Sequence, residues 1–281
     1  LSLLYGISML HSMFNIINTL ILVWFTSLIA KIVTFIIRDR KRSKEEDKTE
    51  DTIKLKFIDG GHLSTAELSI GQARNEIIHF AEISRNGLGY MRQMIKATDE
   101  NTFEEMRLKM VKYEEISDRI EYEIATFLNA MPEDSISDST RADSKRMYKI
   151  IGELESLGDS GEAISRILAR RNTHQQKFTD EQIKRIESMI DALERAYDVM
   201  IENLKANTLD PMGLRKATDC EIEINTMRNN IREEEIYKIE RNEVTYHSSV
   251  YYIDVVSEIE RMGDFVINIS QALYKCKIKV S

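Results

Sequence analysis

Residues that interrupt helices are scarce in this sequence, which has two prolines and eleven glycines among 281 residues. Charged residues make up 31% of the chain, and hydrophobic residues make up 42%, which is enough for an apolar core. Sheet proteins with many turns usually contain more proline and glycine than this chain does. The composition therefore favours long uninterrupted helices over strands.

Cysteine is also scarce. The two cysteines, Cys220 and Cys276, have no close partner in the sequence and form no Cys-x-x-Cys motif. We predict buried free thiols in a reducing compartment, with a disulfide as the alternative. The net charge of −8 and the lack of a basic stripe with interleaved aromatic residues argue against a nucleic-acid partner.

Signatures of common enzyme sites are missing. The sequence has no phosphate loop of the Gly-x-x-x-x-Gly-Lys type, no nucleophile elbow and no evident Cys–His pairing. Glu76 and His79 have the spacing of a ferritin-type di-iron ligand pair, but such a site needs a second pair of this kind. Glu243 and His247 are one residue too far apart to supply it. We therefore expect no enzyme, and we predict that His79 is a partly buried helix residue.

The first thirty residues contain no charged side chain, and the run Met13–Ile37 has Lys31 as its only charge. Such a run exceeds the roughly 20 apolar residues that span a bilayer. The basic stretch "RDRKRSK" follows, which marks a cytoplasmic side. We therefore predict that residues 1–37 are the C-terminal transmembrane segment of a longer inner-membrane protein, and that the rest of the chain lies in the cytoplasm. A signal peptide or a buried core helix are the alternatives.

Beyond a charged linker at residues 38–62, the apolar periodicity predicts an all-α region of six helices. Helices of about 30 residues joined by short turns favour antiparallel bundles. The predicted helices cover residues 65–97, 100–130, 138–171, 180–206, 212–243 and 247–277.

A repeat divides this region. The stretch "ELESLGD" at residues 153–159 returns as "EIERMGD" at residues 258–264, 105 residues later. In the preceding helices, the pair Glu114 and Asp118 returns as Glu221 and Asn225, 107 residues later. Two motifs that recur in the same order predict a duplicated three-helix unit. The units are expected to be two tandem antiparallel three-helix bundles, at residues 63–172 and 178–278.

The repeated motifs place two oxygen-bearing side chains one helical turn apart on a single face. If the second and third helices of each unit pack together, the acids converge and repel one another unless a cation or protons intervene. Hard or borderline metal cations are the ions that such oxygen ligands bind best. The alternative interpretation is that these acids are solvated on the surface and bind no metal. Gly158 and Gly263, next to the acids, suggest close helix approach. The predicted metal ligands are Glu114, Asp118, Glu155, Asp159, Glu221, Asn225, Glu260 and Asp264.

These motifs resemble PhoU-like domains, whose signature is an acid-x-x-x-Asp motif on paired helices in each of two three-helix repeats. The stretch "HSMFNIINTLI" resembles the last membrane helix of bacterial sodium-dependent phosphate cotransporters. The stretch "LKFIDGGHLSTAELSIGQARNEI" is similar to the junction between such a transporter and a fused PhoU-like domain. Asn225 departs from the acid pattern, and Ser156 stands where its repeat-mate is Arg261. Equal occupancy of the two sites is therefore not expected.

The resemblance implies the C-terminal portion of a sodium-coupled phosphate transporter, whose metal-binding PhoU-like domain regulates phosphate uptake. It implies a metal cluster, with iron as the first expectation and manganese or magnesium as alternatives. The implied partners are phosphate and sodium, through upstream membrane segments, together with membrane lipid and a second copy of the chain. A membrane-anchored helical adaptor without metal and a di-metal carboxylate enzyme are the competing hypotheses.

Overall fold

The computed structural model describes residues 9–19, 55–58, 65–131, 137–206 and 210–274. It divides the chain into two parts, at residues 1–54 and 55–281. In the N-terminal part, residues 9–19 are helical. In the C-terminal part, six long helices follow one another: α3 (Ala66–Lys96), α4 (Glu100–Asn129), α5 (Asp138–Thr173), α6 (Asp180–Lys205), α7 (Pro211–Glu240) and α8 (Tyr246–Tyr274).

The helix predictions are confirmed to within a few residues, and no strand occurs in the ranges that the structure describes. Local signals explain the helix starts, because capping side chains satisfy backbone N–H groups that have no intrahelical partner. Thr179 and Gln182 form a capping box at the start of α6, and Pro211 occupies the first turn of α7. Asp99 caps α4 by accepting from Thr102 N at 2.8 Å.

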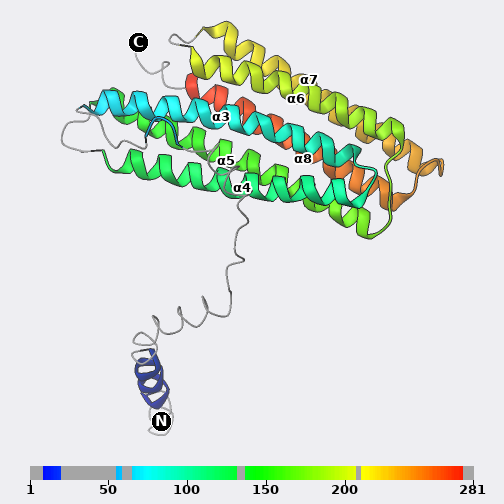
Figure 1. Cartoon of the computed structure of the whole chain (residues 1–281), viewed down its shortest axis with the longest axis horizontal. Coiled ribbons are helices and arrows are strands. Elements are labelled where there is room, and N and C mark those ends of the chain that lie inside the picture. Colours follow the sequence, from blue (N-terminus) through cyan, green and yellow to red (C-terminus); the bar gives the residue numbers. More distant parts are fainter. Residues whose placement is uncertain (1–8, 20–54, 59–64, 132–136, 207–209, 275–281) are drawn as a thin grey trace. The chain divides into compact units, whose positions relative to one another are not determined.

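The six helices form two groups of three that share an interface. Helices α3, α4 and α5 all pack against one another, as do α6, α7 and α8. The most extensive contact joins α5 to α8, and α3 also packs on α6, so the two groups form one compact body. Helices α4 and α7 flank this body on opposite sides (Figure 1).

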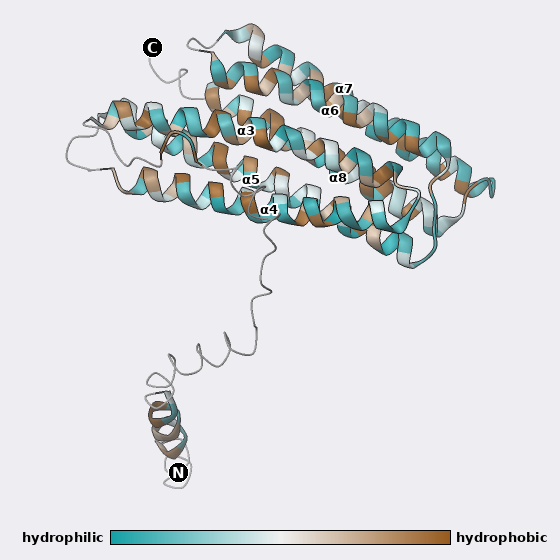
Figure 2. Ribbon diagram, viewed as in Figure 1, coloured by the Kyte–Doolittle hydropathy of each residue, from teal (hydrophilic) through white to brown (hydrophobic). Residues whose placement is uncertain are grey.

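The core follows the amphipathic pattern of each helix, since apolar side chains at helical spacing turn toward neighbouring helices. Figure 2 shows apolar and polar residues interspersed along the helices. The side chains of Ile151, Leu154, Tyr197 and Tyr252 are at most 1% exposed. Helix α8 contributes many of the buried residues, whereas α7 buries few of its own.

None of the helices in the described part of the chain is both long enough and apolar enough to span a bilayer. The predicted membrane run overlaps the helical residues 9–19, and its remainder, residues 20–37, lies outside the described residues. The predicted linker is described only at residues 55–58, and Cys276 also lies outside the described ranges. Cys220 is a half-buried free thiol, and burial raises its pKa.

The short segment at residues 55–58 is attached to α3 through a buried carboxylate. Glu76 is 1% exposed, and its Oε2 accepts hydrogen bonds from Lys56 N at 2.9 Å and Phe57 N at 2.7 Å. His79, one turn later, is half-buried, as the sequence predicts. Glu76 thus fastens the backbone of residues 55–58 to α3.

Candidate metal centre

The acidic motifs of the first unit meet where α4 and α5 come closest together. A Cβ atom added to Gly158 would lie 2.9 Å from Ser117 Oγ and 3.0 Å from Ser117 Cβ. Side-chain atoms hardly ever approach so closely, so only glycine allows this helix spacing. The close approach expected at Gly158 is confirmed. It brings Asp159, the next residue on α5, within reach of Asp118, which follows Ser117 on α4.

Three carboxylates converge at this point. Oxygen atoms of Glu114, Asp118 and Asp159 all lie within 4.8 Å of one another. Glu114 is half-buried, and the two aspartates are exposed. No salt bridge to any of the three occurs within the described ranges. An all-oxygen donor set without a protein cation suits a hard divalent or trivalent metal ion, so these residues can hold a metal.

Further acids surround the triad. Glu155, the remaining predicted ligand of this unit, is half-buried and its Oε2 accepts from Ser156 Oγ at 3.2 Å. Glu121 and Glu162 also act electrostatically on this cluster, and neither is among the predicted metal ligands. Their spacing could have indicated them, because α4 and α5 each carry a third acid three residues after the aspartate of the motif. That spacing keeps all three acids on one helix face.

The pKa values reflect this crowding. Burial raises the pKa of Glu114, and the charges of Asp118 and Glu162 raise it further. Burial also raises the pKa of Glu155, with a further rise from the Asp159 charge. Burial and the neighbouring carboxylates both disfavour the ionised forms of Glu114 and Glu155. A bound cation would offset the part that comes from charge repulsion.

The second unit has the same helix pairing with different chemistry. A Cβ atom added to Gly263 would lie 3.1 Å from Ile224 Cδ1, and Ile224 corresponds to Ser117 by the 107-residue offset. Burial raises the pKa of Glu221, and Asp264 and Glu260 add to the rise. These acids are therefore near one another. In the described residues, however, they do not bring three carboxylate oxygens as close as those of the first unit.

A protein cation occupies this second cluster. Arg228 Nη2 donates to Glu260 Oε1 at 2.5 Å, with side-chain exposures of 28% and 17%. The Arg228 charge also acts to lower the pKa of Asp264, although burial and Glu260 raise it overall. Asn225 Oδ1 is buried and has no hydrogen-bond partner among the described residues. The acids of the two units are thus compensated differently: within the described residues, Glu114, Asp118 and Asp159 form no salt bridge, whereas Glu260 of the second cluster is paired with Arg228.

The fold has a known counterpart. It is similar to that of PhoU from Pseudomonas aeruginosa, with a TM-score of 0.58 and 12% sequence identity. The match covers 74% of this chain and 96% of that one. No family model matches the sequence, and no curated protein matches it either. The chain therefore has a PhoU-like, all-α fold, shown by structure and not by sequence similarity.

Proposed function

We propose that residues 55–281 form a metal-dependent regulatory domain that controls phosphate uptake. The observation that supports this proposal is the unpaired triad of Glu114, Asp118 and Asp159, which lies on a PhoU-like fold. Among PhoU-like proteins, which the sequence motifs resemble, acids in such motifs bind metal clusters. Iron is the first candidate here, with manganese and magnesium as alternatives.

The proposed metal would act as a cross-link between helices. Glu114 and Asp118 belong to α4, whereas Asp159 belongs to α5, so one ion bound to all three would join the two helices. Binding only to the folded state stabilises it by about 2.7 kcal/mol at 100 times the dissociation constant. Metal occupancy would therefore set how firmly α4, a flanking helix, is held against α5.

The N-terminal part of the proposal rests on the sequence. The apolar run Met13–Ile37 and the basic stretch after it support attachment to the inner membrane, with the helical domain in the cytoplasm. The cotransporter-like motifs support a place at the end of a sodium-coupled phosphate transporter. A reporter fused after Ser281 should then be active in the cytosol, and activity on the opposite side of the membrane would reverse this topology.

The metal role is tested on the purified full chain by metal analysis and thermal unfolding. Asp159→Asn should reduce the metal content, and it should also reduce the fall in melting temperature that a chelator causes in the unaltered protein. Asp264→Asn is the matched control in the second unit, and its metal content should stay near that of the unaltered protein. Equal metal content in all three proteins, with unchanged melting, would leave the metal-free adaptor as the better hypothesis.

A further inference from the structure

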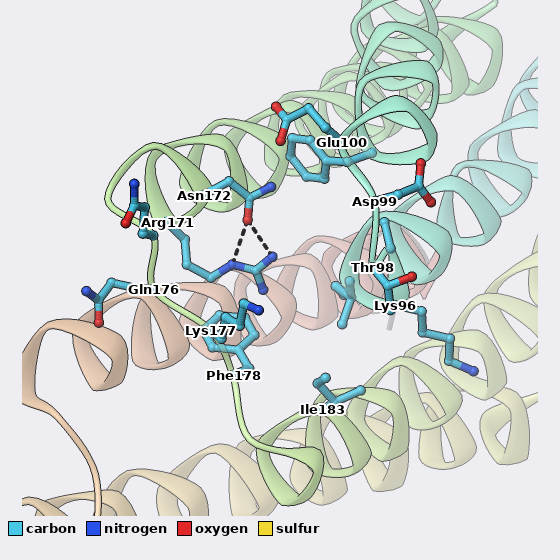
Figure 3. Close-up of a pocket in the computed structure, with 14 residues that line it drawn as sticks. Lys96, Thr98, Asp99, Glu100, Arg171, Asn172, Gln176, Lys177, Phe178 and Ile183 are labelled. Carbon is cyan, nitrogen blue, oxygen red and sulfur yellow. Dashed lines mark hydrogen bonds between the residues drawn. The ribbon is translucent and has the colours of Figure 1, made fainter.

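A pocket of about 630 Å³ lies at the end of the bundle where the α3–α4 and α5–α6 connections meet (Figure 3). It is separate from the acidic centre, since none of the eight predicted metal ligands lines it. Its walls combine apolar side chains, such as Ile95 and Phe103, with polar and basic ones. The volume lies in the range of small-molecule sites, and most of the lining side chains are polar or charged.

A buried arginine lies in the wall of this pocket. Arg171 is 6% exposed, and no other arginine of the described ranges is buried to that degree. Its guanidinium stacks on the Phe178 ring, 4.5 Å from the centroid. Asn172 Oδ1 accepts from Arg171 Nε at 3.1 Å and from Nη2 at 2.8 Å (Figure 3). Burial lowers the pKa of Arg171.

Within the described residues, Arg171 combines burial with the lack of a salt bridge to a carboxylate. Arg85, Arg92 and Arg195, all more exposed, form salt bridges with Asp198, Asp191 and Glu223. A buried charge without a counter-charge is costly in free energy. A neutral amide and an aromatic ring offset only part of that cost. The position of Arg171 in the last turn of α5 offsets only a small further part.

The hydrogen-bonding groups of Arg171 are only partly used. Asn172 takes one edge of the guanidinium, through Nε and Nη2. An arginine has five N–H donors in a planar fork, so three of them remain for a ligand. That free edge, with Nη1 and Nη2, matches the two oxygens of a phosphate or carboxylate group.

The rest of the pocket indicates what such a group would be attached to. Lys177 also lines the pocket and forms no salt bridge within the described residues, whereas Lys96 is paired with Glu187. Thr98 and Asp99 lie across the pocket from Arg171 (Figure 3). The Thr98 hydroxyl at that side suits a ligand body that carries hydroxyl groups, whereas the Asp99 carboxylate caps α4. The volume also exceeds the size of a single inorganic anion.

We propose that this pocket binds a small hydroxylated molecule bearing one oxyanion group, phosphate or carboxylate, which pairs with Arg171. Lys177 assists at the same end, and the polar side chains opposite bind the hydroxyl groups. The ligand supplies the counter-charge that the chain itself does not place beside Arg171. This site is independent of the metal centre.

The test measures binding by calorimetry to the full chain after chelator treatment, so that an anion held by bound metal is not counted. The probes are inorganic phosphate, ribose 5-phosphate and gluconate, with neutral ribose as the uncharged control, all at one ionic strength. Ribose 5-phosphate or gluconate should bind at least tenfold more tightly than ribose, and the stronger of the two identifies the oxyanion. Failure of both charged sugars to bind overturns the proposal.

Two variants with the same change in net charge assign the binding to Arg171. Asn172→Asp places a carboxylate on the guanidinium and should weaken binding of the preferred probe at least tenfold. Arg170→Gln alters an exposed neighbour outside the pocket and should leave binding within twofold. If Asn172→Asp does not fold, Lys177→Gln at an exposed position replaces it, with an expected loss of at least threefold. Binding that is equal in the altered and unaltered proteins contradicts the assignment.

Discussion

The guanidinium of Arg228, on α7, donates to the carboxylate of Glu260, on α8, at 2.5 Å. The position that corresponds to Arg228 by the 107-residue offset is Glu121, on α4 of the first unit. The α7–α8 pair therefore has a protein cation at a position where the α4–α5 pair has a further acid. This exchange of charge is one reason why Glu260 is paired, whereas Glu114, Asp118 and Asp159 form no salt bridge within the described residues.

Exchanging these two residues should exchange the behaviour of the two units. Arg228→Glu removes the cation from the second cluster and adds a carboxylate there. It should destabilise the metal-free protein by about 1.5–3 kcal/mol, the usual worth of a hydrogen bond to a charged group. Added divalent metal should restore part of the loss, as thermal unfolding with and without metal will show.

The reciprocal change places a cation in the first cluster. Glu121→Arg should lower metal content and raise the melting temperature of the chelator-treated protein, because a guanidinium then compensates the acids nearby. Glu123→Arg, at an exposed position on the same helix, makes the same change in net charge as the control. If both substitutions lower metal content equally, the effect is one of overall charge and the proposed centre is wrong.

The close contact of α4 and α5 can be tested by adding one methyl group. Gly158→Ala would place Cβ 2.9 Å from Ser117 Oγ and should destabilise the protein by about 1–3 kcal/mol through overpacking. Gly152→Ala, on the same helix, meets no atom within 4 Å and should stabilise by up to about 1 kcal/mol through helix propensity. Chemical denaturation of both variants measures the contrast, and equal effects would argue against tight packing at Gly158.

The pH dependence of stability should contain a contribution from His79. Burial lowers its pKa below the ordinary 6.5, and the Lys56 charge lowers it further, against smaller opposing effects of Glu76 and Glu82. The unfolded chain therefore binds a proton at a pH where the folded protein does not. Stability from this group is complete above the unfolded pKa and is lost as pH falls toward the folded pKa.

His79→Gln removes this titration. Between about pH 7 and pH 5, the melting temperature of the unaltered protein should fall more steeply than that of the variant. The acidic clusters are common to both proteins, so their effect cancels in the comparison. Parallel curves for the two proteins would show that His79 does not change its protonation on unfolding in this range.

The start of α6 offers a test of the local signals that place the helices. Thr179 Oγ1 accepts from Gln182 N at 3.2 Å, and Gln182 Oε1 accepts from Thr179 N at 2.8 Å. Thr179→Ala removes one half of this capping box and should cost about 1 kcal/mol of unfolding free energy. Thr173→Ala, near the end of α5, is the control, since its hydroxyl bonds to Ala169 O within its own helix. A similar loss in both would mean that the capping box contributes little.

The sequence by itself determined the helices and the acidic motifs. Helix ends depend on neighbours within a few residues, such as Thr179 with Gln182, so they can be read from local spacing. The repeat likewise placed Gly158 and Asp159 on the correct face of α5, because a helix has a fixed period. The third acids, Glu121 and Glu162, follow the same period and could have been predicted from it.

Only the tertiary structure decided which acids remain unpaired and where buried charge lies. The contact of Arg228 with Glu260 depends on the distance and orientation of two helices. These cannot be predicted from the spacing of residues within one helix. The attachment of residues 55–58 by Glu76, and the burial of Arg171 beside Phe178, depend on how connections fold over the ends of helices. A helical period fixes the face on which a side chain lies, whereas packing fixes what that face meets.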